Sequence, residues 1–201
     1  MKPGESAAAA PLPASAARRK MTTEMVKILI SLALAMGILS GCFSGKDWRT
    51  ASRESAGIAP DPSATPEAVL QVYGADAWGW RGWFAIHTWI AAKRTGEAEY
   101  TVYEVVGWRS YRGLPVVRIA RDIPDRYWFG EKPRLLQEHR GAGVDELIAA
   151  VDQAARSYPW KTTYKAFPGP NSNTFTAWIA KQVPALSLDL PFSAIGRGYV
   201  N

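Results

Sequence analysis

The sequence predicts an α+β fold, in which an antiparallel sheet packs against a few helices. The chain has 201 residues and is 47% hydrophobic, so it is long enough for one domain with its own core. Segments with the two-residue alternation of β-strands come first and are joined by short connections, which indicates antiparallel neighbours. Segments with helical spacing come afterwards, and this order is typical of an α+β architecture.

Three β-strands are predicted in the first half of the domain, at residues 83–91, 100–108 and 115–120. Residues 65–73 fit both a helix start and a short strand, and the sequence alone leaves the two open. Residues 161–167 are a candidate for one further strand.

Two helices are predicted after an aromatic loop at residues 122–133. The first covers residues 144–157, where apolar residues recur every three or four positions and acidic residues occupy the first turn. The second follows a rigid Pro-Gly-Pro turn and a cluster of short polar residues suited to capping, and it ends before Pro184. Between the loop and the first helix, His139 lies in a charged stretch expected to be helical and solvent-exposed.

The N-terminal region has the pattern of a secreted, lipid-anchored protein. Residues 28–39 form an apolar run that is short for a membrane span, with basic residues before it and small residues after it. The following Leu39-Ser40-Gly41-Cys42 resembles the lipobox of bacterial lipoproteins, which implies cleavage before Cys42 and acylation of that cysteine, for example with palmitate. Phe43 rather than Asp comes next, and the resemblance then implies the periplasmic face of the outer membrane rather than the inner membrane. A plain signal peptide or a signal anchor is the alternative.

The predicted organisation has three parts. Residues 1–41 contain an N-terminal extension and the lipoprotein signal peptide, and translation starting at Met21 or Met25 would shorten the extension. Residues 42–64 begin with the lipidated cysteine and continue as a flexible Ser, Ala, Gly and Pro-rich tether. Residues 65–201 form a single α+β domain.

Composition argues against several functional classes. The net charge is +6, but half of this excess lies in residues 1–41, and no basic stripe or nucleic-acid motif follows, so no nucleic-acid partner is expected. Cys42 is the only cysteine and there are two histidines, so we expect no disulfide, no metal site and no cofactor. Nine tryptophans indicate either a well-packed core or an aromatic binding surface.

Several segments from about Pro66 to the end resemble a bacterial family, domain of unknown function 3750. This resemblance covers nearly the whole mature chain and implies no particular activity. The segments that carry it are Gly79-Trp80-Arg81-Gly82, His87-Thr88-Trp89-Ile90-Ala91, Tyr103-Glu104-Val105-Val106-Gly107-Trp108, Pro124-Asp125-Arg126-Tyr127-Trp128-Phe129-Gly130 and Pro168-Gly169-Pro170-Asn171-Ser172-Asn173-Thr174-Phe175.

A more distant similarity connects the chain to permuted papain-like (NlpC-type) enzymes. That group places a histidine on an early strand and an Asn-Cys-x-x-Phe motif at a later helix start. Here His87 lies on the strand predicted at residues 83–91, and Asn171-Ser172-Asn173-Thr174-Phe175 opens the last helix. The resemblance implies His87 as general base and Ser172 as nucleophile, although a serine hydroxyl is harder to activate than a thiol. The structural alternatives are a packed, hydrogen-bonded His87 and a Ser172 that caps the helix.

The remaining candidate residues each have a functional and a structural interpretation. Glu104 shares a face of its predicted strand with apolar residues and would orient His87, or it would lie at an exposed edge. Asn171 and Asn173 would donate to an oxyanion, or hold the turn before the helix. Other candidates lie in aromatic loops and would line a pocket for an anionic or sugar-containing ligand; these are Arg81, Arg126 and Trp128.

These patterns lead to two functional hypotheses for a lipid-anchored cell-envelope protein. The first is a hydrolase or acyltransferase that acts on peptide or acyl bonds through His87 and Ser172. The second, which we favour because the expected cysteine is absent, is a non-catalytic binding or structural protein. In that case the membrane, through Cys42, and a cell-wall or envelope component are the expected partners.

Overall fold

The computed structural model describes residues 25–28 and 47–200, which belong to two separate units. Residues 25–28 form a helical turn in the first unit, and the second unit starts at Lys46. Within the described ranges, no helix combines the length and the hydrophobicity that crossing a bilayer requires.

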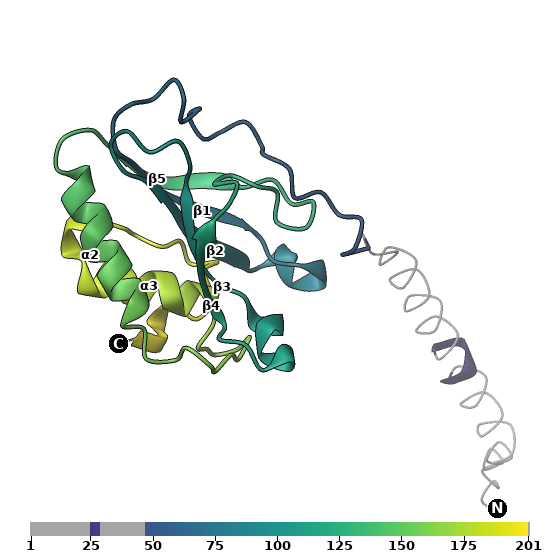
Figure 1. The fold of residues 1–201 in the computed structure, drawn as a ribbon. Helices are drawn as coiled ribbons and strands as arrows, with labels where there is room; N and C mark the ends of the chain where they lie inside the picture. Colours follow the sequence, from purple (N-terminus) through teal and green to yellow (C-terminus); the bar gives the residue numbers. More distant parts are fainter. Residues whose placement is uncertain (1–24, 29–46, 201) are drawn as a thin grey trace, which may run out of the picture. The chain divides into compact units, whose positions relative to one another are not determined.

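The second unit is built on one five-stranded antiparallel sheet, which confirms the predicted α+β fold (Figure 1). Its strands are β1 (Val69–Asp76), β2 (Ile86–Lys93), β3 (Thr101–Val105), β4 (Val117–Arg121) and β5 (Arg134–Arg140). They lie in the order β4-β3-β2-β1-β5. The inner strands β1, β2 and β3 are buried along almost their whole length, because both faces of the sheet are covered.

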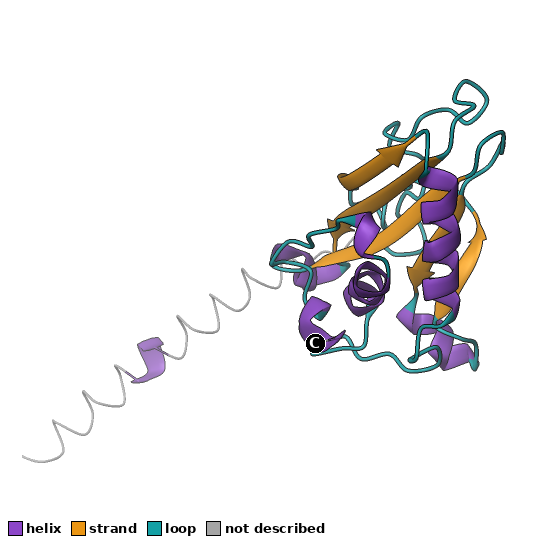
Figure 2. Ribbon diagram, turned by 90° about the vertical axis from the view of Figure 1, so that its left-hand side faces the viewer, coloured by secondary structure: helices purple, strands orange, loops and turns teal. Residues whose placement is uncertain are grey.

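One face of the sheet is covered by two helices, α2 (Val144–Arg156) and α3 (Ser172–Gln182), seen in front of the strands in Figure 2. The apolar face of α2 and the Phe175 and Ile179 side chains of α3 complete the main core with residues of β1, β2 and β3. Four short 3₁₀ helices lie in the connections: η1 (Gly79–Trp83), η2 (Gly107–Arg112), η3 (Pro184–Leu186) and η4 (Arg197–Val200).

The opposite face of the sheet carries a second core and is covered by irregular chain. Side chains from β1, β2 and β3 pack there against Trp128 and Phe129 of the loop that follows β4, and against Ile58 and Ala59. The buried carboxylate of Asp125 accepts hydrogen bonds from the backbone N–H groups of Ile58 and Ala59 at 2.6 and 3.1 Å. Residues 47–64 therefore pack against the domain, and the packed unit starts nearer to residue 47 than to the expected residue 65.

The strand β5 was not predicted from the sequence, because the stretch that forms it was expected to be helical. Its residues favour a helix locally, but the outer edge of β1 needs hydrogen-bond partners and Leu136 packs against the core. The prediction that His139 is solvent-exposed is wrong, because the side chain is half-buried and its Nε2 lies 2.9 Å from the Leu186 carbonyl oxygen. Residues 161–167 are irregular rather than a strand. Of the two alternatives for residues 65–73, the structure shows the strand, because β1 starts at Val69.

Candidate functional site

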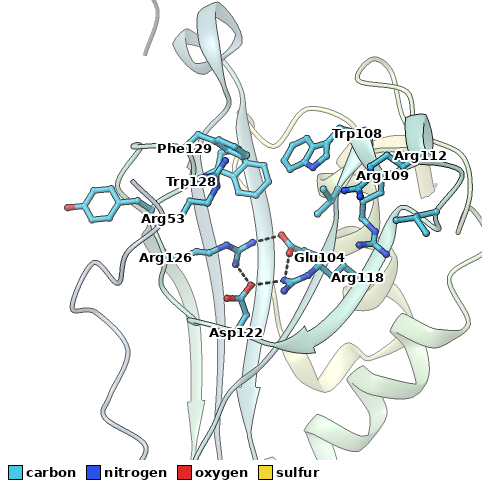
Figure 3. A pocket seen from close by; sticks show the side chains of 13 residues that line it. Arg53, Glu104, Trp108, Arg109, Arg112, Arg118, Asp122, Arg126, Trp128 and Phe129 are labelled. Carbon is cyan, nitrogen blue, oxygen red and sulfur yellow. Dashed lines mark hydrogen bonds and ion pairs between the residues drawn. The ribbon is translucent and has the colours of Figure 1, made fainter. Parts of the chain in front are cut away.

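Glu104 is the charged centre of a polar cluster on the face of the sheet opposite the helices. It lies on β3 with Val102, whereas Tyr103 and Val105 point into the main core. Its side chain is 1% exposed. Arg126 donates from Nη2 to Glu104 Oε2 at 2.6 Å, and Arg118 donates from Nη1 to Oε1 at 2.8 Å, as Figure 3 shows. This buried carboxylate therefore holds two guanidinium groups in place.

The charged neighbours keep Glu104 ionised in spite of its burial. Burial alone raises the pKa of the Glu104 carboxyl, but the guanidinium groups of Arg126 and Arg118 favour the carboxylate more strongly. The balance brings the pKa of Glu104 down from 4.5 to about 2. Arg118 also donates to Asp122 at 2.7 Å, which links a second carboxylate to the cluster.

His87 lies beside Glu104, enclosed by aromatic rings. Its imidazole stacks on the Trp128 indole with 3.5 Å between ring centroids and 7° between planes, and only 7% of the residue is exposed. Its Nε2 lies 3.9 Å from Glu104 Oε2, which is an ion-pair distance too long for a hydrogen bond. Burial lowers the pKa of His87 below 6.5, so the ring is neutral at neutral pH.

The structure does not bring His87 and Ser172 together. Adjacent residues of a strand point to opposite faces, and the Thr88 hydroxyl donates to Asn173 Oδ1 of α3 at 2.9 Å. Thr88 therefore points towards α3, while His87 points towards Trp128 on the other side of the sheet. Ser172, at the first residue of α3, lies on the Thr88 side. The two side chains of the expected papain-like pairing therefore lie on opposite faces of the sheet.

The two asparagines around Ser172 have structural roles. Asn171 is the N-cap of α3, because its Oδ1 accepts from the backbone N–H groups of Asn173 and Thr174 at 3.0 and 3.1 Å. The Asn173 amide donates to the backbone oxygens of Ile86 and Ile195, both at 2.9 Å, and so ties α3 to the start of β2. Asn171, not Ser172, therefore caps the helix, and both amides are used by backbone groups.

A pocket of about 250 Å³ opens beside the Glu104 cluster (Figure 3). Five arginines and two carboxylates line it, together with aromatic and aliphatic side chains. The charged lining residues are Arg53, Arg109, Arg112, Arg118, Arg126, Glu104 and Asp122, and the aromatic ones are Trp108, Tyr127, Trp128 and Phe129. A pocket with this excess of positive charge suits an anionic ligand.

Part of the positive charge in the pocket is not neutralised by the described chain. Nη1 of Arg126 is buried without a hydrogen-bond partner among the described residues and lies 3.9 Å from Asp122. Arg109 donates its Nε to the Pro115 carbonyl oxygen, which fixes the side chain without neutralising it. The Trp108 indole, half-exposed at 46%, packs edge-on against Phe129 and offers a flat surface beside these cations.

The structure places the other expected binding residues differently. Arg126 and Trp128 line the pocket, whereas Arg81 lies on η1 over the Trp80 ring, 5.4 Å from its centroid, and does not line it. Arg53 and Arg118 were not among the residues expected from the sequence, and neither were Arg109 and Arg112. The signal for the latter two is the repeated pairing of an arginine with an aromatic residue, at Trp108-Arg109, Tyr111-Arg112 and Arg126-Tyr127-Trp128.

The donor set suits anions rather than metal ions. In the described ranges, no three His, Cys, Asp or Glu side chains lie close enough together to hold a metal ion. The carboxylates of the pocket are already bound by guanidinium groups. Cys42, the predicted lipidation site, lies outside the described residues.

The fold and the pocket define an α+β domain that presents arginine and tryptophan side chains on the sheet face opposite its helices. The chain belongs to the family described as protein of unknown function (DUF3750), whose model matches residues 67–199. This match covers every strand and both helices of the second unit, and it confirms the family expected from the aromatic and Pro-Gly-Pro segments. No curated protein and no solved structure matches the chain.

Proposed function

We propose that this protein is a non-catalytic binding domain of the cell envelope, and that its arginine-lined pocket takes an anionic ligand. The observation that carries the proposal is the set of five arginines that face two carboxylates around a pocket of about 250 Å³. Guanidinium groups bind carboxylates and phosphates with paired, charge-assisted hydrogen bonds.

The Trp108 ring beside these arginines favours a ligand with a flat or sugar ring next to its charged group. Indole faces are common in sites that bind such rings, because they bury apolar area at little entropic cost. A sugar acid or sugar phosphate of an envelope polymer has both features. The small volume of the pocket favours one ring with one charged group over a long chain.

The geometry gives less support to a hydrolase. A neutral His87 could act as a base, but its ring is stacked on Trp128 and its Nε2 is buried. The sheet also separates it from Ser172. A general base must reach the proton that it removes, directly or through one water. Glu104 is ionised, but both of its oxygens are occupied by Arg118 and Arg126.

We expect small anions to stabilise the purified protein, and Arg112→Gln to weaken their binding about ten- to a hundredfold, the usual cost of one charge-assisted hydrogen bond. The probes are inorganic phosphate, pyrophosphate and N-acetylmuramic acid. At a ligand concentration of a hundred times Kd, binding adds about 2.7 kcal/mol, which raises Tm by roughly 5–10 °C for a domain of this size. Isothermal titration and thermal unfolding measure both quantities.

Arg156→Gln is the matched control for this experiment. Arg156 is an exposed arginine that pairs with Asp152 within α2. Because α2 covers the sheet face opposite the pocket, loss of Arg156 should leave anion binding unchanged. Equal weakening by Arg112→Gln and Arg156→Gln would indicate non-specific attraction to net charge. No stabilisation by any of the three probes at millimolar concentration would contradict the proposal.

We also propose that lipid on Cys42 anchors the domain to a membrane, with the periplasmic face of the outer membrane as the expected location. The support is the apolar run followed by Leu39-Ser40-Gly41-Cys42. Each buried methylene contributes about 0.8 kcal/mol, so several acyl chains anchor a protein stably where one does not. The mature protein should begin at Cys42 and carry acyl mass, and Cys42→Ala should remain unprocessed. Identical mass and fractionation of the two forms would argue against the anchor.

A further inference from the structure

We propose that one exposed side of the domain docks onto an anionic lipid bilayer, next to the predicted anchor. This aromatic face consists of Trp48, Trp80, Trp83, Phe84, Trp108 and Tyr111. The proposal rests on the proposed anchoring at Cys42. It shares Trp108, Arg109 and Arg112 with the pocket, but docking is measured at positions that do not line the pocket.

The aromatic face exposes far more apolar ring surface than a solvated loop region needs. Its six residues are between 46% and 91% exposed, and three of them lie within five residues of each other in and after η1. The Trp80 and Phe84 rings also contact each other, with 5.6 Å between centroids. Contiguous exposed apolar surface of this kind marks a site that contacts a partner or a membrane.

Hydrogen bonds and ring contacts join the three segments that make up the aromatic face. The Trp48 carbonyl oxygen accepts a hydrogen bond from Arg53, whose guanidinium lies 4.3 Å from the centroid of the Phe129 ring. Phe129 packs edge-on against Trp108 of η2 at 5.2 Å and against Trp78, the residue before η1, at 5.6 Å. The start of the second unit, η1 and η2 therefore surround Phe129, and they lie on the side away from α2 in Figure 1.

Arginines are interleaved with the rings of the aromatic face. Arg49, Arg81, Arg109 and Arg112 each follow an aromatic residue directly in the sequence, and Arg49 pairs with Asp47 at 3.8 Å. Tryptophan and tyrosine prefer the headgroup layer of a bilayer, and arginine is attracted to anionic headgroups while its stem packs on apolar surface. The combination fits an anionic membrane surface better than a neutral one.

The position of the predicted anchor selects the membrane as the occupant of this surface. Asp47, the first described residue of the second unit, lies five positions after Cys42, and five residue steps span about 17 Å at most. Residues 47–64 pack against the sheet, so they add no further reach. A lipid on Cys42 therefore keeps Trp48, and with it the aromatic face, close to the bilayer.

Docking is measured with an environment-sensitive nitrobenzoxadiazole label on single introduced cysteines. The full, lipidated chain is reconstituted into vesicles of phosphatidylcholine with 30% phosphatidylglycerol, and acylation leaves no free native thiol. Trp83→Cys labels η1, Tyr111→Cys labels η2, and Gln153→Cys labels the exposed side of α2 as the matched control. None of these residues lines the pocket.

We expect the labels at positions 83 and 111 to shift to shorter wavelength with a several-fold rise in emission, and the label at 153 to remain as in water. In vesicles of phosphatidylcholine alone the rise should be smaller, and an equal rise would remove the role given to the arginines. Water-like emission at all three positions would overturn docking while leaving anchoring and anion binding intact. If the nitrobenzoxadiazole reagent labels the chain without an introduced cysteine, the Cys42 thiol is free. That result would overturn the anchoring together with docking.

Discussion

Replacing Glu104 by glutamine is expected to lower the free energy of unfolding by about 3–5 kcal/mol. The carboxylate is 1% exposed and binds Arg126, itself only 9% exposed, and Arg118. Removing its charge leaves the buried Arg126 guanidinium with Asp122, at 3.9 Å, as its remaining acidic neighbour among the described residues. This distance is too long for a hydrogen bond. Urea denaturation at pH 7, where both groups are charged, measures the loss.

Glu97→Gln is the matched control, because Glu97 binds Arg121 at the surface, where both side chains are at least 31% exposed. An exposed pair contributes about 1 kcal/mol or less. Similar losses for Glu104→Gln and Glu97→Gln would contradict the role given to Glu104. A loss below about 1 kcal/mol at position 104 would do the same.

The pH dependence gives an independent measure of the same interaction. The pKa of Glu104 is lowered from 4.5 to about 2 in the folded state, so its stabilisation is complete above pH 4.5 and is lost as the pH falls towards 2. This shift corresponds to about 3 kcal/mol. The pKa of His87 is also lowered, so its contribution decreases as the pH falls below 6.5. Glu104→Gln should therefore flatten the acid limb below pH 4.5.

Replacing Asn171 by alanine is expected to lower the free energy of unfolding by about 2 kcal/mol. The change removes the cap of α3, which is worth about 1 kcal/mol. It also removes the part-buried hydrogen bond from the Asn171 amide to the carbonyl oxygen of the exposed Ala166 at 3.0 Å, and such a bond contributes about 1 kcal/mol. The Ile195 oxygen retains a second donor, the Asn173 amide.

Ser172→Ala is the control for this measurement, because Ser172 is the neighbouring buried residue and its hydroxyl does not cap the helix. It should cost less than about 1 kcal/mol. A larger loss for Ser172→Ala than for Asn171→Ala, in urea denaturation of the two variants, would reverse the assignment of the cap. Loss of a biological activity in a stably folded Ser172→Ala variant would revive the nucleophile hypothesis.

The local pattern of the sequence determined most of the secondary structure. Spacing of apolar residues located α2, and the polar cluster after the Pro-Gly-Pro turn located the start of α3. Alternation along β2 also placed His87 and Thr88 on opposite faces, as observed. These features depend on backbone geometry within one element, which neighbouring residues specify.

The tertiary structure alone decided which side chains meet. His87 and Ser172 matched a catalytic order in the sequence, yet α3 covers the Thr88 face of the sheet and Trp128 covers the His87 face. The strand β5 formed against its local preference because the edge of β1 supplies hydrogen-bond partners. The pocket joins Arg53 to residues of β3, η2, β4 and the loop after β4, and only packing between these elements sets the distances between their side chains. Sequence spacing fixes the face of a strand on which a residue lies, but not what covers that face.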